Sequence, residues 1–264
     1  MAGAAPNHSS PVAFITGASS GFGRGLALRL AGEGYALGLS ARREDRLAAL
    51  VEEVEAEGGK AVAYPCDVAD REALLEEIRR CGEEVGPIDL LIANAGVSTH
   101  ALPEDLDSRE VERVMRINFQ GTVTAAEGVL EGMMKRGWGH IVVVSSLASF
   151  QGLPYHGSYC ASKAAMNAFF ESLRLDVAHL GVAVTIIAPG FVKTEMTAHN
   201  RYPMPFLMEL EPALDIMVRG IRKKKKMVRF PFPLSSVTWW ARILPRGLFD
   251  RLVGKVGGSR RQTL

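Results

Sequence analysis

A tyrosine and a lysine four positions apart, Tyr159 and Lys163, are the side chains best suited to move a proton. On a helix, residues at this spacing share one face and lie a turn apart. A free phenol has a pKa of about 10, too high for efficient proton transfer at neutral pH. A neighbouring ammonium stabilises the phenolate, and roughly 4 kcal/mol of such interaction lowers the pKa by about 3 units. The pair predicts a general acid/base, with Ser146, thirteen residues before Tyr159, as a hydrogen-bond donor to the same substrate oxygen.

A glycine-rich turn, residues 16–23 (TGASSGFG), follows a short apolar run and precedes a helical pattern. Its glycines allow a tight turn and let the backbone approach a pyrophosphate, and the following helix N-terminus attracts the phosphates. A turn without any ligand is the alternative, because the Gly-x-x-x-Gly-x-Gly spacing differs from the common dinucleotide fingerprint. We expect a dinucleotide phosphate site formed by Gly17, Ser19, Ser20, Gly21, Phe22 and Gly23.

The same turn also fits the Gly-x-Ser-x-Gly nucleophile elbow of hydrolases, with Ser19 in the serine position. A hydrolase would need an acid and a histidine after later strands. His156 and His179 come late enough, but neither has an obvious acidic partner. An elbow also has no need of Gly23, so the dinucleotide interpretation is favoured over the hydrolase.

Further motifs follow the expected strands in order along the chain. Together with the glycine-rich turn and the Tyr159–Lys163 pair, they make roughly residues 11–196 resemble the short-chain dehydrogenase/reductase family. A single Tyr-x-x-x-Lys is common, and it is the shared order of several motifs that makes the resemblance specific. The motifs are Asp67-Val68, Asn94-Ala95-Gly96, Ser146, and Pro189-Gly190 with Thr194.

The resemblance implies a nicotinamide-dependent oxidoreductase that interconverts a carbonyl and a secondary alcohol, with Tyr159 as the general acid/base. Lys163 would also bind the nicotinamide ribose, and Asn118 would complete the catalytic group, although an ordinary structural role is the alternative for this asparagine. A protein that senses NADPH without turnover is a rival class, against which the intact Ser146, Tyr159 and Lys163 argue. The cofactor-binding residues that the resemblance adds are Asp67, Val68, Asn94, Ala95, Gly96, Tyr159, Lys163, Pro189, Gly190, Val192 and Thr194.

The end of the second expected strand indicates which cofactor is used. NAD specificity usually rests on an acid there, and the family's NAD enzymes place Asp where this chain has Ala41. Arg42 and Arg43 follow at once, and guanidinium groups bind phosphate well. Alternatively, they begin a charged surface helix with Glu44 and Asp45 as partners. The missing acid favours NADP(H), with Arg42 and Arg43 at its 2′-phosphate.

The elements that must position these residues alternate between short apolar runs and longer helical patterns. The expected strands cover residues 11–16, 36–40, 61–65, 90–93, 141–145, 182–188 and 227–230, and helices such as 43–57 and 71–84 lie between them. The strands are apolar on both faces, as in a parallel sheet covered by helices. This order predicts an α/β fold: one doubly wound, Rossmann-type domain of about seven parallel strands over residues 11–264, after a frayed leader at 1–10.

Composition narrows the class of protein further. Three scattered cysteines favour a cytoplasmic protein, and the six histidines show no metal-ligand spacing, so we expect no metal. The family resemblance also implies that residues 191–215 form a lid over the substrate, where Met196 and Phe206 favour a lipophilic substrate or else simply pack the lid onto the domain. Small residues such as Ala125 and Ala164 on two helices favour a homodimer or homotetramer, although they could instead pack within one subunit. We expect no nucleic-acid partner.

Charge is distributed unevenly along the chain. From Arg219 onward there are 13 basic residues and one acidic residue (+12), whereas the preceding residues carry 18 basic and 28 acidic ones (−10). Apolar residues at helical spacing within 234–256 make residues 231–264 a basic amphipathic extension. Such a segment could bind an anionic membrane. The favoured alternative is that its helices pack over the substrate cleft.

Overall fold

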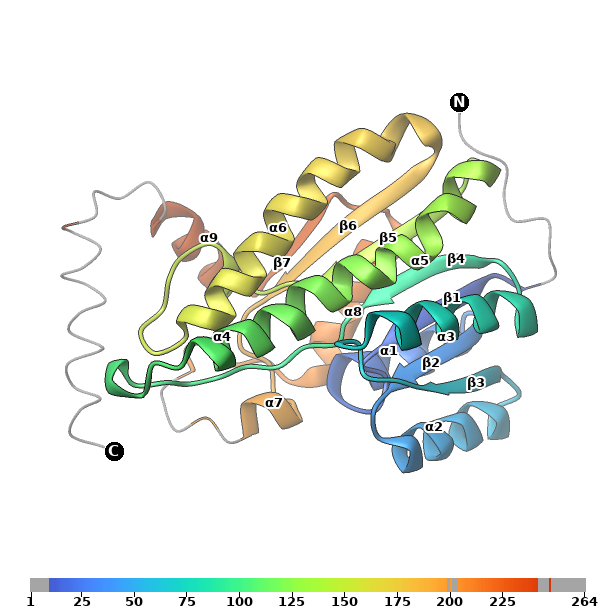
Figure 1. Ribbon diagram of the computed structural model, residues 1–264, viewed down its shortest axis with the longest axis horizontal. Coiled ribbons are helices and arrows are strands. Elements are labelled where there is room, and N and C mark those ends of the chain that lie inside the picture. The colour runs from blue at the N-terminus through green and yellow to red at the C-terminus, as the bar shows by residue number, and fades with distance from the viewer. Residues whose placement is uncertain (1–9, 199, 201–203, 242–246, 248–264) are drawn as a thin grey trace.

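The computed structural model describes residues 10–198, 200, 204–241 and 247. Seven strands form one parallel sheet in the order β3-β2-β1-β4-β5-β6-β7 (Figure 1), which confirms the predicted fold class. The strands are β1 Val12–Thr16, β2 Ala36–Ala41, β3 Lys60–Pro65, β4 Ile88–Ala93, β5 Gly139–Val144, β6 Val182–Pro189 and β7 Met227–Phe230. The order reverses between β1 and β4, so a crevice is expected beyond their carboxyl ends.

The strand boundaries lie within two residues of those predicted. The largest differences are at the starts of β4 and β5, and β4 shows a physical reason. Its second residue, Asp89, is polar but buried, and its carboxylate accepts a 2.9 Å hydrogen bond from the Val12 amide. The register between β1 and β4 shifts at this point. Asp89 therefore satisfies a backbone group at an irregularity, which a search for apolar runs overlooks.

Helices cover both faces of the sheet. Buried side chains of α1, α2 and α8 form one core on one face, and those of α3, α5 and α6 form a second core on the other (Figure 1). Both faces are thus sealed, which explains why the strands are apolar throughout. The helices are α1 Gly21–Ala31, α2 Glu44–Ala56, α3 Arg71–Glu84, α4 Ser108–Met115, α5 Gly121–Arg136, α6 Gly157–Val177, α7 Glu195–Ala198, α8 Leu210–Arg222 and α9 Phe232–Ala241.

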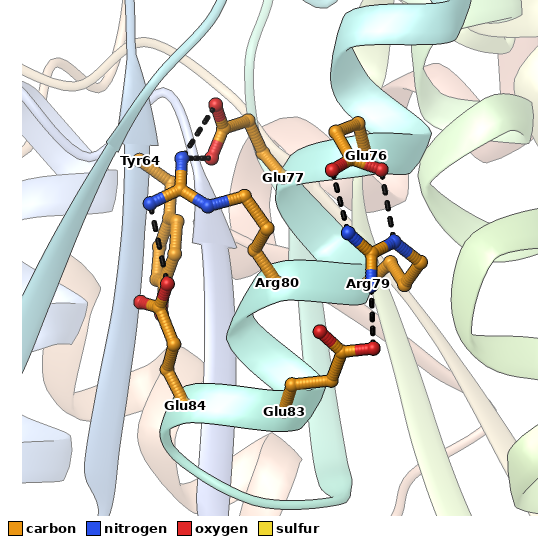
Figure 2. A network of polar contacts seen from close by, with 7 residues as sticks. All are labelled: Tyr64, Glu76, Glu77, Arg79, Arg80, Glu83 and Glu84. Atoms are coloured by element: carbon orange, nitrogen blue, oxygen red, sulfur yellow. Dashed lines mark hydrogen bonds and ion pairs between the residues drawn. The ribbon is translucent and has the colours of Figure 1, made fainter.

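The outer face of α3 carries a network of ion pairs (Figure 2). Arg79 and Arg80 each bridge an acid three residues earlier and another four residues later. The Arg80 guanidinium also lies 5.7 Å from the ring centroid of Tyr64 in β3, whose hydroxyl donates to the Glu84 carboxylate at 3.0 Å. Each exposed pair contributes a few tenths of a kcal/mol. The face thus joins α3 to the sheet edge. The residues drawn are Tyr64, Glu76, Glu77, Arg79, Arg80, Glu83 and Glu84.

The C-terminal part of the described chain runs along the β7 edge. Leu234 in α9 packs against the small cluster of Leu147, Phe150 and Ala188, beside the loop after β5. The start of the predicted extension therefore packs against the domain beside the loop that follows β5. Residues 242–246 and 248–264, which include most of the predicted membrane-contact segment, and leader residues 1–9 lie outside the described residues. Within the described part, no helix combines the length and apolar character needed to cross a bilayer.

Candidate functional site

A cleft opens at the carboxyl ends of the strands, where the strand order reverses. Most of the predicted cofactor residues line it: Gly17, Ser19, Ser20, Gly21, Phe22, Arg42, Arg43, Asp67, Val68, Asn94, Ala95, Gly96 and Thr194. Segments far apart in the chain thus meet at the place where doubly wound folds bind their ligands. The cleft lining that was not assigned from the sequence consists of Ala41, Cys66, Val97, Ile117, Glu195 and Met196.

The glycine-rich turn forms the floor of this cleft, between β1 and α1. Gly17 and Gly21 have φ angles of +67° and +52°, which favour glycine. Gly23 lies behind the turn, and a Cβ there would be 2.2 Å from the Gly17 carbonyl oxygen. The N-cap Ser20 makes no side-chain capping hydrogen bond, so it leaves the first amides of α1 to another acceptor. The turn therefore fits a phosphate, which needs close backbone approach and unclaimed N–H donors.

Asn94 holds the turn in place from the end of β4. Its Nδ2 donates to the Thr16 and Gly17 carbonyl oxygens, both at 3.1 Å. The Thr16 hydroxyl oxygen accepts from the Asn94 and Ala95 amides, also at 3.1 Å. The side-chain amide of Asn94 therefore points toward the glycine-rich turn. Its role at the cleft is to hold that turn in position.

Two arginines at the end of β2 are held differently. Arg42 is 63% exposed, and its guanidinium lies 3.9 Å from the Asp67 carboxylate. Arg43, the N-cap of α2, donates to the Ser19 hydroxyl at 3.0 and 3.2 Å and to the Ser20 hydroxyl at 2.9 Å. Neither guanidinium pairs with Glu44 or Asp45, the partners that a plain surface helix would use. Both arginines face the cleft.

Ser19 and Cys66 are nucleophile types in the cleft, but neither is activated. The Ser19 hydroxyl oxygen accepts from Arg43, and among the described residues no histidine accepts its proton, which removes the support for a nucleophile elbow. Burial raises the pKa of the Cys66 thiol to about 11, so this thiol stays protonated at neutral pH. Cys66, Cys81 and Cys160 are all free and buried.

Tyr159 and Lys163 lie one turn apart near the start of α6, as predicted. The Lys163 Nζ lies 5.9 Å from the centroid of the Tyr159 ring and donates a 2.8 Å hydrogen bond to the Val144 carbonyl oxygen. Lys163 is only 4% exposed, and burial lowers the pKa of its ammonium to about 8. A cation is therefore fixed beside the phenol in a dry setting, where its field is little screened.

Asn118 lies in a π-helical turn, Arg116–Gln120, between α4 and α5. It is fully buried, and its side chain exchanges hydrogen bonds with the Val97 backbone at 2.8 and 2.9 Å and donates to the Ser162 hydroxyl at 3.0 Å. A Cβ on Gly96 would lie 3.2 Å from Asn118 Oδ1 and 3.5 Å from Lys163 Nζ. The structure thus brings Asn118 and Lys163 together at Gly96, on the edge of the cleft. Turns of this kind are frequent at functional sites.

The two serines after β5 face different ways. Ser145 is buried, and its hydroxyl donates to the Lys163 carbonyl oxygen at 3.4 Å. Ser146 is partly exposed, and its hydroxyl oxygen accepts from the Ala148 amide at 3.1 Å. A bond from Asn167 Nδ2 to the Ser149 hydroxyl at 2.7 Å ties the same loop to α6. Of the pair, Ser146 is the one with a hydroxyl left to face a ligand.

Some predicted cofactor residues lie beyond the cleft lining. Pro189 ends β6, and Gly190 packs against Pro231 and Leu234 so closely that a Cβ would lie 3.0 and 2.9 Å from them. Val192 is buried and forms a β-bridge with Met208. These residues position Thr194, which does line the cleft.

Comparison with known proteins agrees with this architecture. A model of the short chain dehydrogenase family matches residues 11–204. An uncharacterised oxidoreductase of Myxococcus xanthus is 45% identical over 238 residues, covering 90% of this chain and 94% of that protein. An alcohol dehydrogenase from Thermococcus sibiricus complexed with 5-hydroxy-NADP has a TM-score of 0.76 and 28% identity, covering 84% of this chain and 96% of its own. A 3-oxoacyl-[acyl-carrier protein] reductase from Brucella melitensis with bound NAD has a TM-score of 0.74 and 26% identity, covering 85% and 90%.

The parallel sheet with helices on both faces defines a doubly wound, Rossmann-type fold. The chain belongs to the short-chain dehydrogenase family. The predicted family and fold are both confirmed.

Proposed function

We propose that this protein is an NADP(H)-dependent oxidoreductase that interconverts a carbonyl and a secondary alcohol. The observation that carries the proposal is the pairing of Tyr159 with a buried Lys163 one turn away, whose ammonium lies next to Gly96 at the cleft edge. A proton-transfer group and a cation beside it are what this reaction needs at one end of a nucleotide cleft.

The side chains divide the work as follows. The Tyr159 hydroxyl gives its proton to the carbonyl oxygen, and the Ser146 hydroxyl donates a hydrogen bond to that oxygen as negative charge develops on it. The Lys163 ammonium stabilises the phenolate that Tyr159 becomes. Asn118 positions the turn after β4 through its bonds with Val97. When bound, the nicotinamide supplies or accepts the hydride, and the reverse reaction uses the same groups.

The preference for NADP(H) rests on the end of β2. Ala41 leaves no acid there to bind the ribose hydroxyls, and Arg42 and Arg43 line the same part of the cleft. Arg42 has one ionic contact, the 3.9 Å approach to Asp67, so its guanidinium can turn to a 2′-phosphate. The glycine-rich turn would hold the pyrophosphate, and Lys163 would bind the nicotinamide ribose. The structural relatives include one bound to an NADP derivative and one bound to NAD.

A lipophilic carbonyl compound is the proposed substrate class. The segment 191–215, the proposed lid, presents Met196, Phe206 and Leu207 with 47%, 54% and 37% of their surface exposed. Hydrogen bonds between Met208 and both Phe191 and Lys193 tie its later part to its start. Met196 lines the cleft, and an apolar side chain there suits a substrate with an alkyl or aromatic group. The names of two structural relatives, an alcohol dehydrogenase and a 3-oxoacyl-[acyl-carrier protein] reductase, support a carbonyl or alcohol substrate.

Two assays test the proposal in sequence. Thermal unfolding is measured with NADPH, with NADH and with neither, and we expect NADPH to raise the Tm most. NADPH oxidation is then followed against ketones and aldehydes of increasing alkyl length, and we expect turnover to rise with chain length. Stabilisation by NADPH without turnover of any carbonyl would indicate the sensor instead of the enzyme. Stabilisation by neither nucleotide contradicts both.

We also propose a homodimer or homotetramer in the cytoplasm. Ala125 and Ala126 are buried inside the subunit, so part of the predicted small-residue surface of α5 serves internal packing. Ala161, Ala164 and Ala168 on α6 are exposed and leave a face where a second subunit could pack closely. Light scattering at micromolar concentration is expected to give a multiple of 28.6 kDa. A membrane contact through residues 234–256 remains the less favoured proposal.

A further inference from the structure

The first residue of α7, Glu195, joins the proposed lid to the nucleotide end of the cleft. Its carboxylate accepts a 3.0 Å hydrogen bond from Arg43 Nη1 and another from Arg46 Nη1 in the first turn of α2. These two arginines lower the pKa of Glu195, so the carboxylate is charged at neutral pH. Glu195 lines the same cleft as the glycine-rich turn and Arg43.

Arg43 is the centre of this arrangement. Nε and Nη2 of its guanidinium donate to Ser19 and Ser20, while Nη1 donates to Glu195. The guanidinium therefore connects the glycine-rich turn, the start of α2 and the start of α7. These four bonds use four of the five N–H groups of the guanidinium, and Glu195 takes one of the two on Nη1, the nitrogen that does not bond to the turn.

We propose that Glu195 is a specificity-determining residue that competes with the cofactor 2′-phosphate for Arg43. This inference rests on the proposed use of NADP(H). A phosphate that engages Arg43 must displace the carboxylate or share one cation with it, and two anions on one guanidinium repel each other. NAD(H) has no 2′-phosphate, so the Arg43–Glu195 pair persists when it binds. Glu195 therefore reduces the ratio of NADP(H) to NAD(H) affinity that Arg42 and Arg43 create.

Arg46 makes the exchange possible without leaving Glu195 unpaired. When Arg43 turns to a phosphate, the carboxylate keeps its bond with Arg46, which lies one helical turn from Arg43. Glu195 is 55% exposed and Arg43 is 41% exposed, so solvent screens their attraction. Exposed ion pairs of this kind contribute little to folding. A Glu195 variant is thus expected to fold and to report on nucleotide binding.

The test is a comparison of the dissociation constants of NADPH and NADH in wild type, Glu195→Gln and Glu209→Gln. Glu209 is the matched control, because it lies in the same segment, is 63% exposed and pairs with Lys193, outside the cleft lining. We expect Glu195→Gln to bind NADPH about three- to fivefold more tightly, the range of a partly exposed charge pair. NADH binding is expected to stay within about twofold, and Glu209→Gln to match wild type for both nucleotides.

An Arg43→Ala background separates competition from general repulsion. If Glu195 acts through Arg43, adding Glu195→Gln to Arg43→Ala no longer tightens NADPH. The same tightening with and without Arg43 overturns the proposal, as does an equal change for both nucleotides or a weaker NADPH complex in Glu195→Gln. The wild-type constants judge the proposed function separately. No preference for NADPH in wild type contradicts the cofactor proposal, whereas the Glu195 inference is judged on the change in the NADPH-to-NADH ratio.

Discussion

The two ends of the cleft hold their cations in opposite ways. At the nucleotide end, Arg42 and Arg43 have 63% and 41% of their side-chain surface exposed, and the acids near them, Asp67 and Glu195, are exposed as well. At the other end, Lys163 is buried and bonded to a backbone carbonyl. Guanidinium groups keep their charge at any physiological pH, whereas desolvation brings the pKa of the Lys163 ammonium down to about 8. The arginines at the nucleotide end can therefore exchange ionic partners. The Lys163 ammonium is fixed in place, but its charge depends on pH.

The largest effect is expected from removing the group beside the buried cation. Tyr159→Phe keeps the ring near Lys163 but lacks the hydroxyl that moves the proton, so turnover should fall by about 10²–10⁴-fold. NADPH affinity should be nearly unchanged. Steady-state kinetics and nucleotide titration on the folded variant measure both quantities.

Tyr64→Phe is the control for this variant, because it also removes a phenol hydroxyl but in β3, where the partner is Glu84. It should turn over like wild type. Retained activity in Tyr159→Phe would remove Tyr159 from the proposed mechanism.

The buried Lys163 ammonium should also make the free energy of unfolding of the nucleotide-free protein depend on pH. Burial lowers the pKa of Lys163 from 10.5 to about 8, so between these values the unfolded chain binds more protons at this site than the folded one. Stability contributed by this site therefore rises with pH over that window, by up to roughly 3 kcal/mol. Lys163→Met should lack this rise, as measured by urea unfolding at pH 7.5, 9 and 10.5.

The exposed Lys135, paired with Glu131, supplies the comparison, and Lys135→Met should keep the wild-type pH dependence. The window also contains the ordinary titration range of phenols, and Tyr159 is the phenol beside Lys163. All three proteins therefore also carry Tyr159→Phe, so that the titration of the remaining phenols cancels in the difference. Identical pH profiles for wild type and Lys163→Met would mean that the buried ammonium is not destabilised by burial.

The smallest effect is expected at the exposed end. Arg42→Ala should weaken NADPH by about 1.5 kcal/mol, near tenfold and at the lower end for a charged hydrogen bond, because solvent screens this site. NADH should be little affected, and higher salt should shrink the difference. Arg79→Ala, on the outer face of α3 and outside the cleft lining, should change neither titration. A loss of equal size for both nucleotides would show that Arg42 does not bind the 2′-phosphate.

Local motifs explain why much of the site could be predicted from the sequence. The glycine-rich turn and the Tyr159–Lys163 pair depend on short spacings, and residues that follow parallel strands must meet at one edge of the sheet. Glu195 carries no such signal, because its partner Arg43 lies 152 residues away and any exposed glutamate looks alike. Asp89 was likewise missed, since its role depends on a register shift between two strands.

The direction in which a side chain points also could not be predicted from the sequence. Asn94 follows β4 at the expected place, but only the structure shows its amide turned onto the glycine-rich turn. Ser146 was chosen over Ser145 from the sequence, and the structure adds that the Ser145 hydroxyl bonds to α6, whereas the Ser146 hydroxyl oxygen accepts from the turn that follows. Helical periodicity also predicts no π turn at Asn118, since one surplus residue leaves the apolar pattern on either side intact.

That surplus residue sets the rotational phase between α4 and α5. Each residue of an α-helix advances the chain by about 100° around the axis. Deleting one residue from Arg116–Gln120 would restore a regular helix, yet it would turn α4 by that angle and swing its buried Val114 out of the core. An insertion or deletion at this turn therefore rotates the whole of α4 about its axis. This stretch should therefore resist changes in length that an exposed loop of the same size would absorb.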